Sequence, residues 1–326
     1  MLTEKLTEVF EQYDIKVLQV IKGRGSYICT TKEGVYSLQP FSSTLSKIEC
    51  EYELLNQLKE AGFFLVDQYI RSQEQELVVQ DKYHNDFVLK EHYEGKELDI
   101  RNLSQIKEGA RNLANLHKKM RDVTLSLGEN KEKTNPEQIF YSRNQELKRI
   151  RNYIRKVCKK GTFELTFMKH YEEFMKQGEN VYEELKVKHM SSQSHMGFCH
   201  GNYNQHNVIF TKKGIATIHF EQFYYGNQML DLYQFMRKVL EKNGYEMGVA
   251  KEILNQYQME LPLSREDYEY IYCMLSYPEK FWKLANHYYN NKKTWIPPKT
   301  IEKLNDVIAQ NQKKNEFLQE FQEFYQ

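Results

Sequence analysis

Residues 199–220 constrain the fold more than any other part of the chain. They begin with the polar segment CHGNYNQHN and continue with two apolar runs, VIF and IATIHF, joined by Thr211-Lys212-Lys213-Gly214. Short runs of β-branched and aromatic residues around a glycine-containing turn are typical of a β-hairpin. The neighbouring segments have the apolar spacing of helices. The sequence therefore predicts a hairpin inside a helical domain.

The first part of the chain predicts a small antiparallel sheet with helices. Residues 1–13 place apolar side chains on one helical face, and residues 15–41 mix β-branched and aromatic residues with glycine-containing turns. A helix is expected over 43–61, where apolar residues recur at helical spacing and Gly62 follows as a stop. Two further strands are expected at 76–80 and 86–93.

The rest of the chain reads almost wholly as helices. Amphipathic stretches lie near residues 103–121, 136–159, 163–189, 229–242, 246–258, 264–290 and 299–324. The sequence has no internal repeat and no Pro/Gly/Ser-rich linker. We therefore expect an α+β protein of two packed lobes, a β-rich lobe over 1–95 and a helical lobe over 96–326 that contains the loop segment 198–221.

Composition restricts the classes of partner. The 326 residues are 40% hydrophobic, enough for a large core, and 46 Lys+Arg against 45 Asp+Glu leave a net charge of +1. A balanced charge and no recognition motif argue against a nucleic-acid partner. No apolar run reaches about 18 residues, so no membrane insertion is expected. The apolar residues of 1–13 lie on one helical face rather than forming a signal-peptide core, so no signal peptide is expected. The five scattered cysteines form no CxxC pair, which favours reduced thiols.

The loop and its surroundings resemble the kinase-like fold of aminoglycoside and choline phosphotransferases. In that group the pattern HGDxxxxN places a catalytic aspartate and a metal-holding asparagine on one loop, and the next strand ends in a second metal-binding aspartate. The matching residues of this chain are His200, Gly201, Asn202, Asn207 and His219. The resemblance thus implies a catalytic site in which both acids are replaced, one on the loop and one after the following hairpin.

Those replacements matter chemically. The first aspartate accepts the proton of the attacking hydroxyl, and the second gives Mg²⁺ a hard anionic oxygen. Asn202 has no proton-accepting carboxylate, and the imidazole of His219 suits zinc or copper better than magnesium. Gln39 stands where such kinases carry the phosphate-binding lysine, so Glu49 or Glu53 would lack its ion-pair partner.

Each of the remaining candidates has a structural alternative. His200 and Asn207 can brace the loop without touching a metal. Asp231 resembles an acid that supports the catalytic loop, but it also fits a charge at a helix N-terminus. Glu221 can supply a metal oxygen in place of His219, or it can be a solvated carboxylate. The expected relict nucleotide and metal site therefore comprises Gln39, Glu53, Asn207, His219 and Glu221.

The residues near the loop also raise the possibility of a zinc site. The ligand types gather there as His195, Cys199, His200, His206 and His219. No short paired spacing such as CxxC or HExxH orders them, so no metal site is predicted from this cluster.

Three longer segments are similar to the CotS-type spore-coat family of endospore-forming bacteria. They read YNQHNVIF, MLDLYQFMRKVLEKNGYEM and YPEKFWKLANHYYNNKKTWIP. Members of that family have a kinase-like fold. The resemblance implies synthesis in the mother-cell cytoplasm, assembly into the spore coat, and other coat proteins as partners.

Together these observations predict a degenerate, kinase-like scaffold of the spore coat with Asn202 at the position of the lost base. The alternative is an active ATP-dependent phosphotransferase with a rewired metal site that uses Glu221 and Asn207. ATP with Mg²⁺ is the only cofactor implied, and only if the site is still used.

Overall fold

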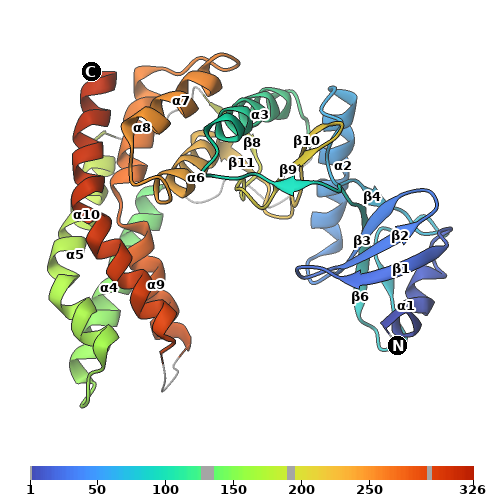
Figure 1. Ribbon diagram of the computed structural model, residues 1–326, viewed down its shortest axis with the longest axis horizontal. Coiled ribbons are helices and arrows are strands. Elements are labelled where there is room, and N and C mark those ends of the chain that lie inside the picture. Colours follow the sequence, from blue (N-terminus) through green and yellow to red (C-terminus); the bar gives the residue numbers. More distant parts are fainter. Residues whose placement is uncertain (1, 126–135, 189–194, 292–295) are drawn as a thin grey trace. The chain divides into compact units, whose positions relative to one another are not determined.

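The chain forms two compact units. The computed structural model describes residues 2–125, 136–188, 195–291 and 296–326. One unit, here called the sheet unit, comprises residues 1–131 and 197–225, and the other, the helical unit, comprises 132–196 and 226–326 (Figure 1). The lobe boundary near Gly95 stays a prediction, because these units follow different limits.

An antiparallel sheet forms the first part of the sheet unit. Its strands follow the order β1-β2-β3-β6-β4, and β5 also pairs with β6. Their bounds are β1 Val17–Lys22, β2 Tyr27–Thr31, β3 Val35–Pro40, β4 Tyr69–Ile70, β5 Val79–Gln80 and β6 Asp86–Glu91. The predicted antiparallel sheet at this end of the chain is confirmed.

The register of β3 and β6 gives the sheet two different faces. Ser37 lies opposite Lys90, and Gln39 lies opposite Val88. Directly opposed residues of an antiparallel pair lie on one face, and residues two apart share it. Gln39 and Lys90 therefore lie on the same face. The other face packs against α1 (Leu2–Phe10) in a core of Leu6, Val9, Phe10, Tyr13, Cys29, Leu38, Val79, Phe87 and Leu89.

Two longer helices complete this part of the chain. Helix α2 spans Leu45–Glu60 and begins at the N-cap Thr44, whose side chain accepts from the amide of Lys47. Its buried face carries Ile48, Glu51, Leu54, Leu55 and Leu58. Helix α3 spans Leu103–Arg121, in agreement with the predicted range. Glu51 is thus a carboxylate in an otherwise apolar stripe, a position that requires a partner.

The predicted hairpin is confirmed. Strands β9 (Val208–Thr211) and β10 (Gly214–Thr217) pair antiparallel, and β7 (Lys96–Glu97) pairs with β9. A side chain at Gly95 would lie 2.3 Å from the carbonyl oxygen of Phe210, so this close approach requires glycine. Strands β8 (Met196–Cys199) and β11 (Tyr224–Asn227) pair separately.

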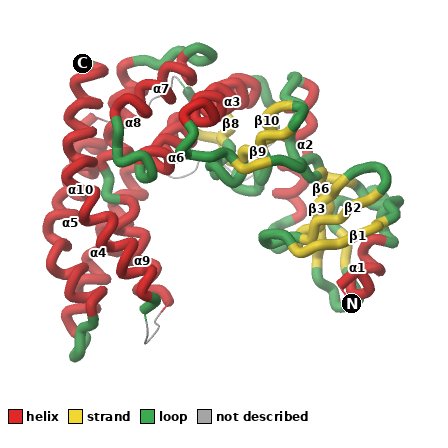
Figure 2. The backbone as a smooth tube through the Cα atoms, in the orientation of Figure 1, coloured by secondary structure: helices red, strands yellow, loops and turns green. Residues whose placement is uncertain are grey.

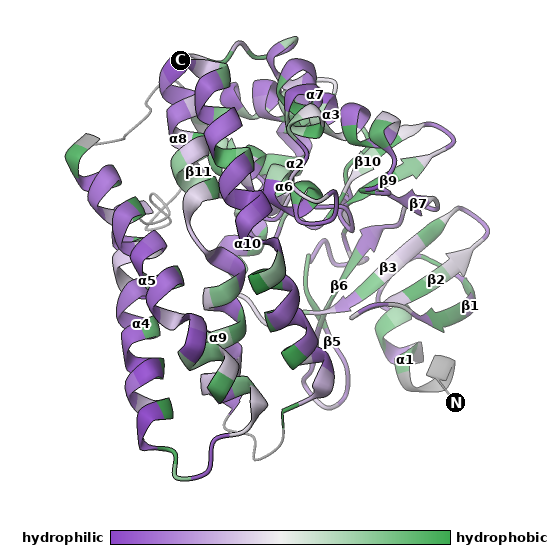
Figure 3. Cartoon of the chain, turned by 60° about the vertical axis from the view of Figure 1, so that its left-hand side comes forward, coloured by the Kyte–Doolittle hydropathy of each residue, from purple (hydrophilic) through white to green (hydrophobic). Residues whose placement is uncertain are grey.

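The helical unit is built from helices α4 to α10. They are α4 Pro136–Lys156, α5 Thr162–Lys188, α6 Met229–Leu240, α7 Met247–Gln258, α8 Arg265–Ser276, α9 Glu279–Asn291 and α10 Pro298–Tyr325 (Figure 2). The core between α4, α5, α9 and α10 is rich in aromatic side chains, such as Phe163, Phe167, Phe174 and Phe281. Hydrophilic and hydrophobic residues mix along the helices (Figure 3). No helix in the described ranges has the length and apolar composition needed to cross a membrane.

One predicted helix is wrong. The range 264–290 was expected to be continuous, but α8 ends at Ser276 and α9 begins at Glu279. Pro278 has no N–H to donate, and its ring disfavours helical backbone at the residue before it. Tyr277 accordingly adopts an extended conformation with ψ 138°.

Candidate functional site

His200 braces the loop. Its Nδ1 accepts a hydrogen bond from the amide of Asn202 at 3.2 Å, so its Nε2–H is the donor to the carbonyl oxygen of Ile218 at 3.0 Å. The ring is fully buried and lies against Phe220 with the centroids 4.5 Å apart. The bracing role that the sequence left open for His200 is therefore the arrangement found.

Gly201 permits a turn that no other residue allows. Its φ is +77°, in the left-handed region, and an added Cβ would lie 2.0 Å from the carbonyl oxygen of Gln222. The loop and the segment after the hairpin are therefore in backbone contact at this point.

Amide groups hold the rest of the loop. Asn204 donates to the main-chain oxygen of Asn202 at 2.8 Å and to its side-chain oxygen at 2.9 Å. The side chain of Asn207 donates to the same main-chain oxygen at 2.9 Å. Asn202 is exposed at the tip, whereas Asn204 and Asn207 are buried. The side chain of Asn202 is thus solvent-accessible, and its oxygen accepts a hydrogen bond from another amide.

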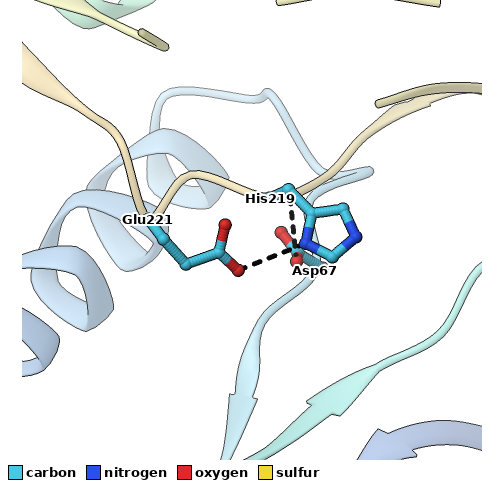
Figure 4. Close-up of side chains that lie close together, drawn as sticks. All are labelled: Asp67, His219 and Glu221. Carbon is cyan, nitrogen blue, oxygen red and sulfur yellow. Dashed lines mark hydrogen bonds and ion pairs between the residues drawn. The ribbon is translucent and has the colours of Figure 1, made fainter. Parts of the chain in front are cut away.

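The segment after the hairpin brings an imidazole and a carboxylate together. His219 has φ +67°, and its main-chain N–H donates to Oδ2 of Asp67 at 3.0 Å. Its Nδ1 lies 3.2 Å from Oε1 of Glu221 (Figure 4). Asp67 comes from the segment between α2 and β4, so two distant parts of the chain meet here.

Lys90 on β6 lies at the centre of three carboxylates. Its Nζ is 2.7 Å from Glu51, 3.3 Å from Asp67 and 3.3 Å from Glu221. It also lies 4.3 Å from the ring centroid of Tyr69, within cation–π range. The side chains of Lys90, Glu51 and Asp67 are almost fully buried, whereas that of Glu221 is 39% exposed. We call these four residues with His219 the Lys90 cluster.

Mutual electrostatics set the protonation of the Lys90 cluster. Burial would lower the pKa of Lys90, but Asp67, Glu51 and Glu221 raise it well above its usual value. Burial raises the pKa of Glu51 and of Asp67. Burial also acts to raise the pKa of Glu221, but Lys90 and His219 lower it. For His219, burial acts to lower the pKa and the hydrogen bond to Glu221 raises it overall.

Not all of the expected site residues meet. His219 and Glu221 lie together, and Gln39 lies on the sheet face of Lys90, where it donates to Ser37. Glu53 is on the exposed side of α2 and accepts from Gln57. Asp231 is fully buried in the first turn of α6, in the helical unit. Loop support by Asp231 stays a prediction.

The glutamate of α2 that faces inward is Glu51, and its carboxylate forms an ion pair with Lys90. The sequence expectation that Glu49 or Glu53 faces a missing cation is wrong, because both lie on the exposed side of α2. Helical spacing could have identified Glu51, since it falls in the stripe of Ile48, Leu55 and Leu58. Lys90 and Asp67 gave no such signal.

The histidines considered for zinc contact different partners. His195 Nε2 lies 3.1 Å from Asp267, and His206 Nδ1 contacts Glu97. His200 is bound to main-chain atoms, as described above. These contacts do not assemble the five-residue zinc cluster that was considered.

The donor set does not fit magnesium as kinase-like enzymes hold it. Such a site needs a carboxylate where this chain has the imidazole of His219, and Mg²⁺ prefers carboxylate, phosphate and water ligands. The nearest carboxylates, Asp67 and Glu221, are already in contact with Lys90. The residues present therefore do not make the magnesium site of a kinase-like enzyme.

Solved structures with a similar fold are phosphotransferases. An aminoglycoside phosphotransferase from Alicyclobacillus acidocaldarius matches with a TM-score of 0.85 and 16% identity, over 98% of this chain and 96% of that one. A spectinomycin phosphotransferase solved with ADP and spectinomycin matches with a TM-score of 0.68 and 14% identity, over 95% and 98%. The choline kinase LicA from Streptococcus pneumoniae gives 0.55 and 16%, over 97% and 98%. These likenesses confirm the kinase-like α+β fold.

A relative found by sequence is a spore-coat protein. Spore coat protein S of Bacillus subtilis (strain 168) is 25% identical over 177 residues, which is 50% of this chain and 48% of that relative. The match thus spans about half of the relative's length. The model of the family described as "Spore coat putative kinase YutH" matches residues 6–321. The sequence predicted the CotS-type spore-coat family with its kinase-like fold, and this prediction is confirmed: the chain belongs to the "Spore coat putative kinase YutH" family.

Proposed function

We propose that the protein works in the spore coat as a kinase-like scaffold that binds other coat proteins and has lost efficient phosphoryl transfer. The observation that carries this proposal is that the loop and the segment after it have few carboxylates for catalysis or metal binding. Between residues 196 and 227 the sequence contains a single carboxylate, Glu221. That carboxylate contacts both Lys90 and His219.

Missing groups account for a large loss of rate. A positioned general base typically contributes about 10²–10⁴-fold, and Asn202 cannot act as one. The metal ion and the phosphate-binding lysine neutralise charge that develops on the phosphates, which supplies most of the catalysis in phosphoryl transfer. The ammonium of Lys90 has three N–H donors and makes three hydrogen bonds, each to a carboxylate. It therefore has no donor left for a phosphate oxygen.

The coat setting is supported by the family and by the relative. Both carry spore-coat names, and the cellular course we propose is synthesis in the mother-cell cytoplasm followed by assembly on the spore. The partners proposed are coat proteins, with a nucleotide as an optional ligand of the relict site.

An active phosphotransferase is the second candidate, and one observation favours it. Lys90 and Glu51 reproduce the kind of strand-lysine and helix-glutamate pair that kinase-like enzymes use, although from β6. In this reading Asn207 and Glu221 hold the metal ion.

Nucleotide binding and turnover separate the two candidates. The purified protein is titrated with ATP, with and without Mg²⁺ or Mn²⁺, and followed by thermal shift and by release of phosphate. Asn207→Ala is the control, because it removes the amide at the metal-holding position. We expect no metal-dependent turnover above the control. Metal-dependent turnover that disappears in Asn207→Ala would establish the phosphotransferase instead.

The scaffold role is tested in spores. The gene is deleted in the endospore-forming host, and the coat proteins extracted from mature spores are compared after complementation with wild type or with Asn202→Ala. We expect deletion to change the set of coat proteins extracted from spores. The wild-type gene and the Asn202→Ala gene should restore that set equally. Restoration by wild type but not by Asn202→Ala, with equal protein levels, would contradict a scaffold without catalysis.

A further inference from the structure

We propose that Asp67, His219 and Glu221 form a binding site for a transition-metal dication of the zinc, cobalt or nickel class. One ligand atom from each residue lies within 4.8 Å of the other two. Figure 4 shows the three side chains gathered at the segment that follows β10. This site is independent of the scaffold role, because it holds whether or not the chain transfers phosphate.

An unsatisfied buried oxygen points to a missing ligand. Asp67 is 3% exposed, and its Oδ2 accepts from the amide of His219 and contacts Lys90. Its Oδ1 is buried and has no hydrogen-bond partner. Leaving a buried carboxylate oxygen unpaired is costly, more so than for a neutral group. A cation bound beside His219 and Glu221 would satisfy it.

The Lys90 cluster holds more carboxylates than cations. The carboxylates of Glu51, Asp67 and Glu221 surround the single ammonium of Lys90. Burying carboxylates without matching cations is unfavourable. A dication bound beside Asp67 and Glu221 would offset this excess.

Lys90 does not prevent the metal from binding. Its contact with Glu51 is the shortest, at 2.7 Å, whereas those with Asp67 and Glu221 are 3.3 Å. These longer contacts use Oδ2 of Asp67 and Oε1 of Glu221, so the other oxygen of each carboxylate remains for the ion. The side chains of His219 and Glu221 are 38% and 39% exposed, so an ion can enter from solvent.

The donor types select the metal. One imidazole nitrogen with two carboxylate oxygens suits zinc and the late first-row dications, which bind nitrogen ligands well. Mg²⁺ demands oxygen ligands in near-octahedral geometry and gains little from imidazole. The replacement of aspartate by His219 at the metal position therefore changes the metal class rather than only weakening the site.

Cobalt provides a probe with a spectrum. The full-length protein is stripped with a chelator and titrated with Co²⁺, and the visible absorption of protein-bound Co²⁺ is recorded. Zn²⁺ and Mg²⁺ are then added as competitors. We expect one equivalent of bound Co²⁺, displaced by Zn²⁺ and not by an equal concentration of Mg²⁺. Binding of Co²⁺ that Mg²⁺ displaces equally well, or no bound Co²⁺, would overturn the proposal.

Variants locate the site. His219→Asn keeps a residue tolerated at positive φ but removes the imidazole, and Asp67→Asn keeps the shape of the buried carboxylate. Each should weaken Co²⁺ binding at least about tenfold. His206→Asn is the matched control, since His206 pairs with Glu97 in a similar, half-exposed contact without a buried carboxylate. If Asp67→Asn does not fold, His219→Asn decides alone: affinity equal to wild type there would place the ion elsewhere.

Discussion

The ammonium of Lys90 lies 2.7 Å from the carboxylate of Glu51, and it reaches that helix from β6 rather than from β3. In the kinase-like fold the corresponding lysine is expected on the strand that here carries Gln39. Both residues lie on one face of the sheet, because Ser37 and Gln39 oppose Lys90 and Val88. In this chain the cation that pairs with the helix glutamate therefore lies on β6, and contacts with Asp67 and Glu221 hold it inside the protein.

Lys90→Met should destabilise the protein strongly. It leaves three carboxylates facing one another without their shared cation, and breaking a buried ion pair typically costs about 3–5 kcal/mol. Lys59→Met is the matched control, because Lys59 pairs with Glu91 at 3.2 Å with both side chains about one-third exposed. An exposed pair is worth less than about 1 kcal/mol. Urea unfolding at neutral pH compares the two variants, and equal losses would show that Lys90 is not a structural cation.

The fold followed from local patterns, whereas the Lys90 cluster did not. The spacing of apolar residues predicted α3 at its observed bounds, and a glycine turn predicted the hairpin of β9 and β10. Lys90 and Glu51 are 39 residues apart, and His219 and Asp67 are 152 apart. Such contacts depend on which strands pair and which helix face turns inward, and no periodicity in the sequence encodes them. The catalytic-loop pattern identified His219 because a local motif carries it.

Gly201→Ala should be severely destabilising. The residue has φ +77°, and the new Cβ would lie 2.0 Å from a main-chain oxygen that cannot move as a side chain can. Left-handed backbone alone costs an alanine about 1–2 kcal/mol, and the clash adds to it. Gly25→Ala measures the cost of the left-handed backbone alone, since Gly25 has φ +74° and no atom lies within 4 Å of the added Cβ. Thermal unfolding of both variants should show a clearly larger loss for Gly201→Ala; similar losses would mean that the loop moves away freely.

Lys314 should make the stability of the helical unit depend on alkaline pH. Its ammonium donates to the carbonyl oxygens of Ser276 and Tyr277, and burial lowers its pKa to about 8, partly opposed by Glu241. In the unfolded chain a lysine has a pKa of about 10.4, so between these values the unfolded state binds more protons. The free energy of unfolding therefore rises with pH in this window. Unfolding of wild type and Lys314→Met is measured from pH 7 to 10. The advantage of wild type over the variant should grow above pH 8, and an unchanged difference would contradict the lowered pKa.

His219→Asp should exchange the metal preference of the site. The substitution replaces the imidazole with a third carboxylate and keeps a residue tolerated at φ +67°. A set of three carboxylates with water suits Mg²⁺ or Mn²⁺, and loss of the nitrogen ligand weakens the hold on zinc and cobalt. We expect bound Co²⁺ to become displaceable by Mg²⁺ in this variant, whereas His206→Asp should leave the wild-type preference unchanged. Retention of the cobalt preference by His219→Asp would show that the imidazole is not a ligand and that the acids alone bind the ion.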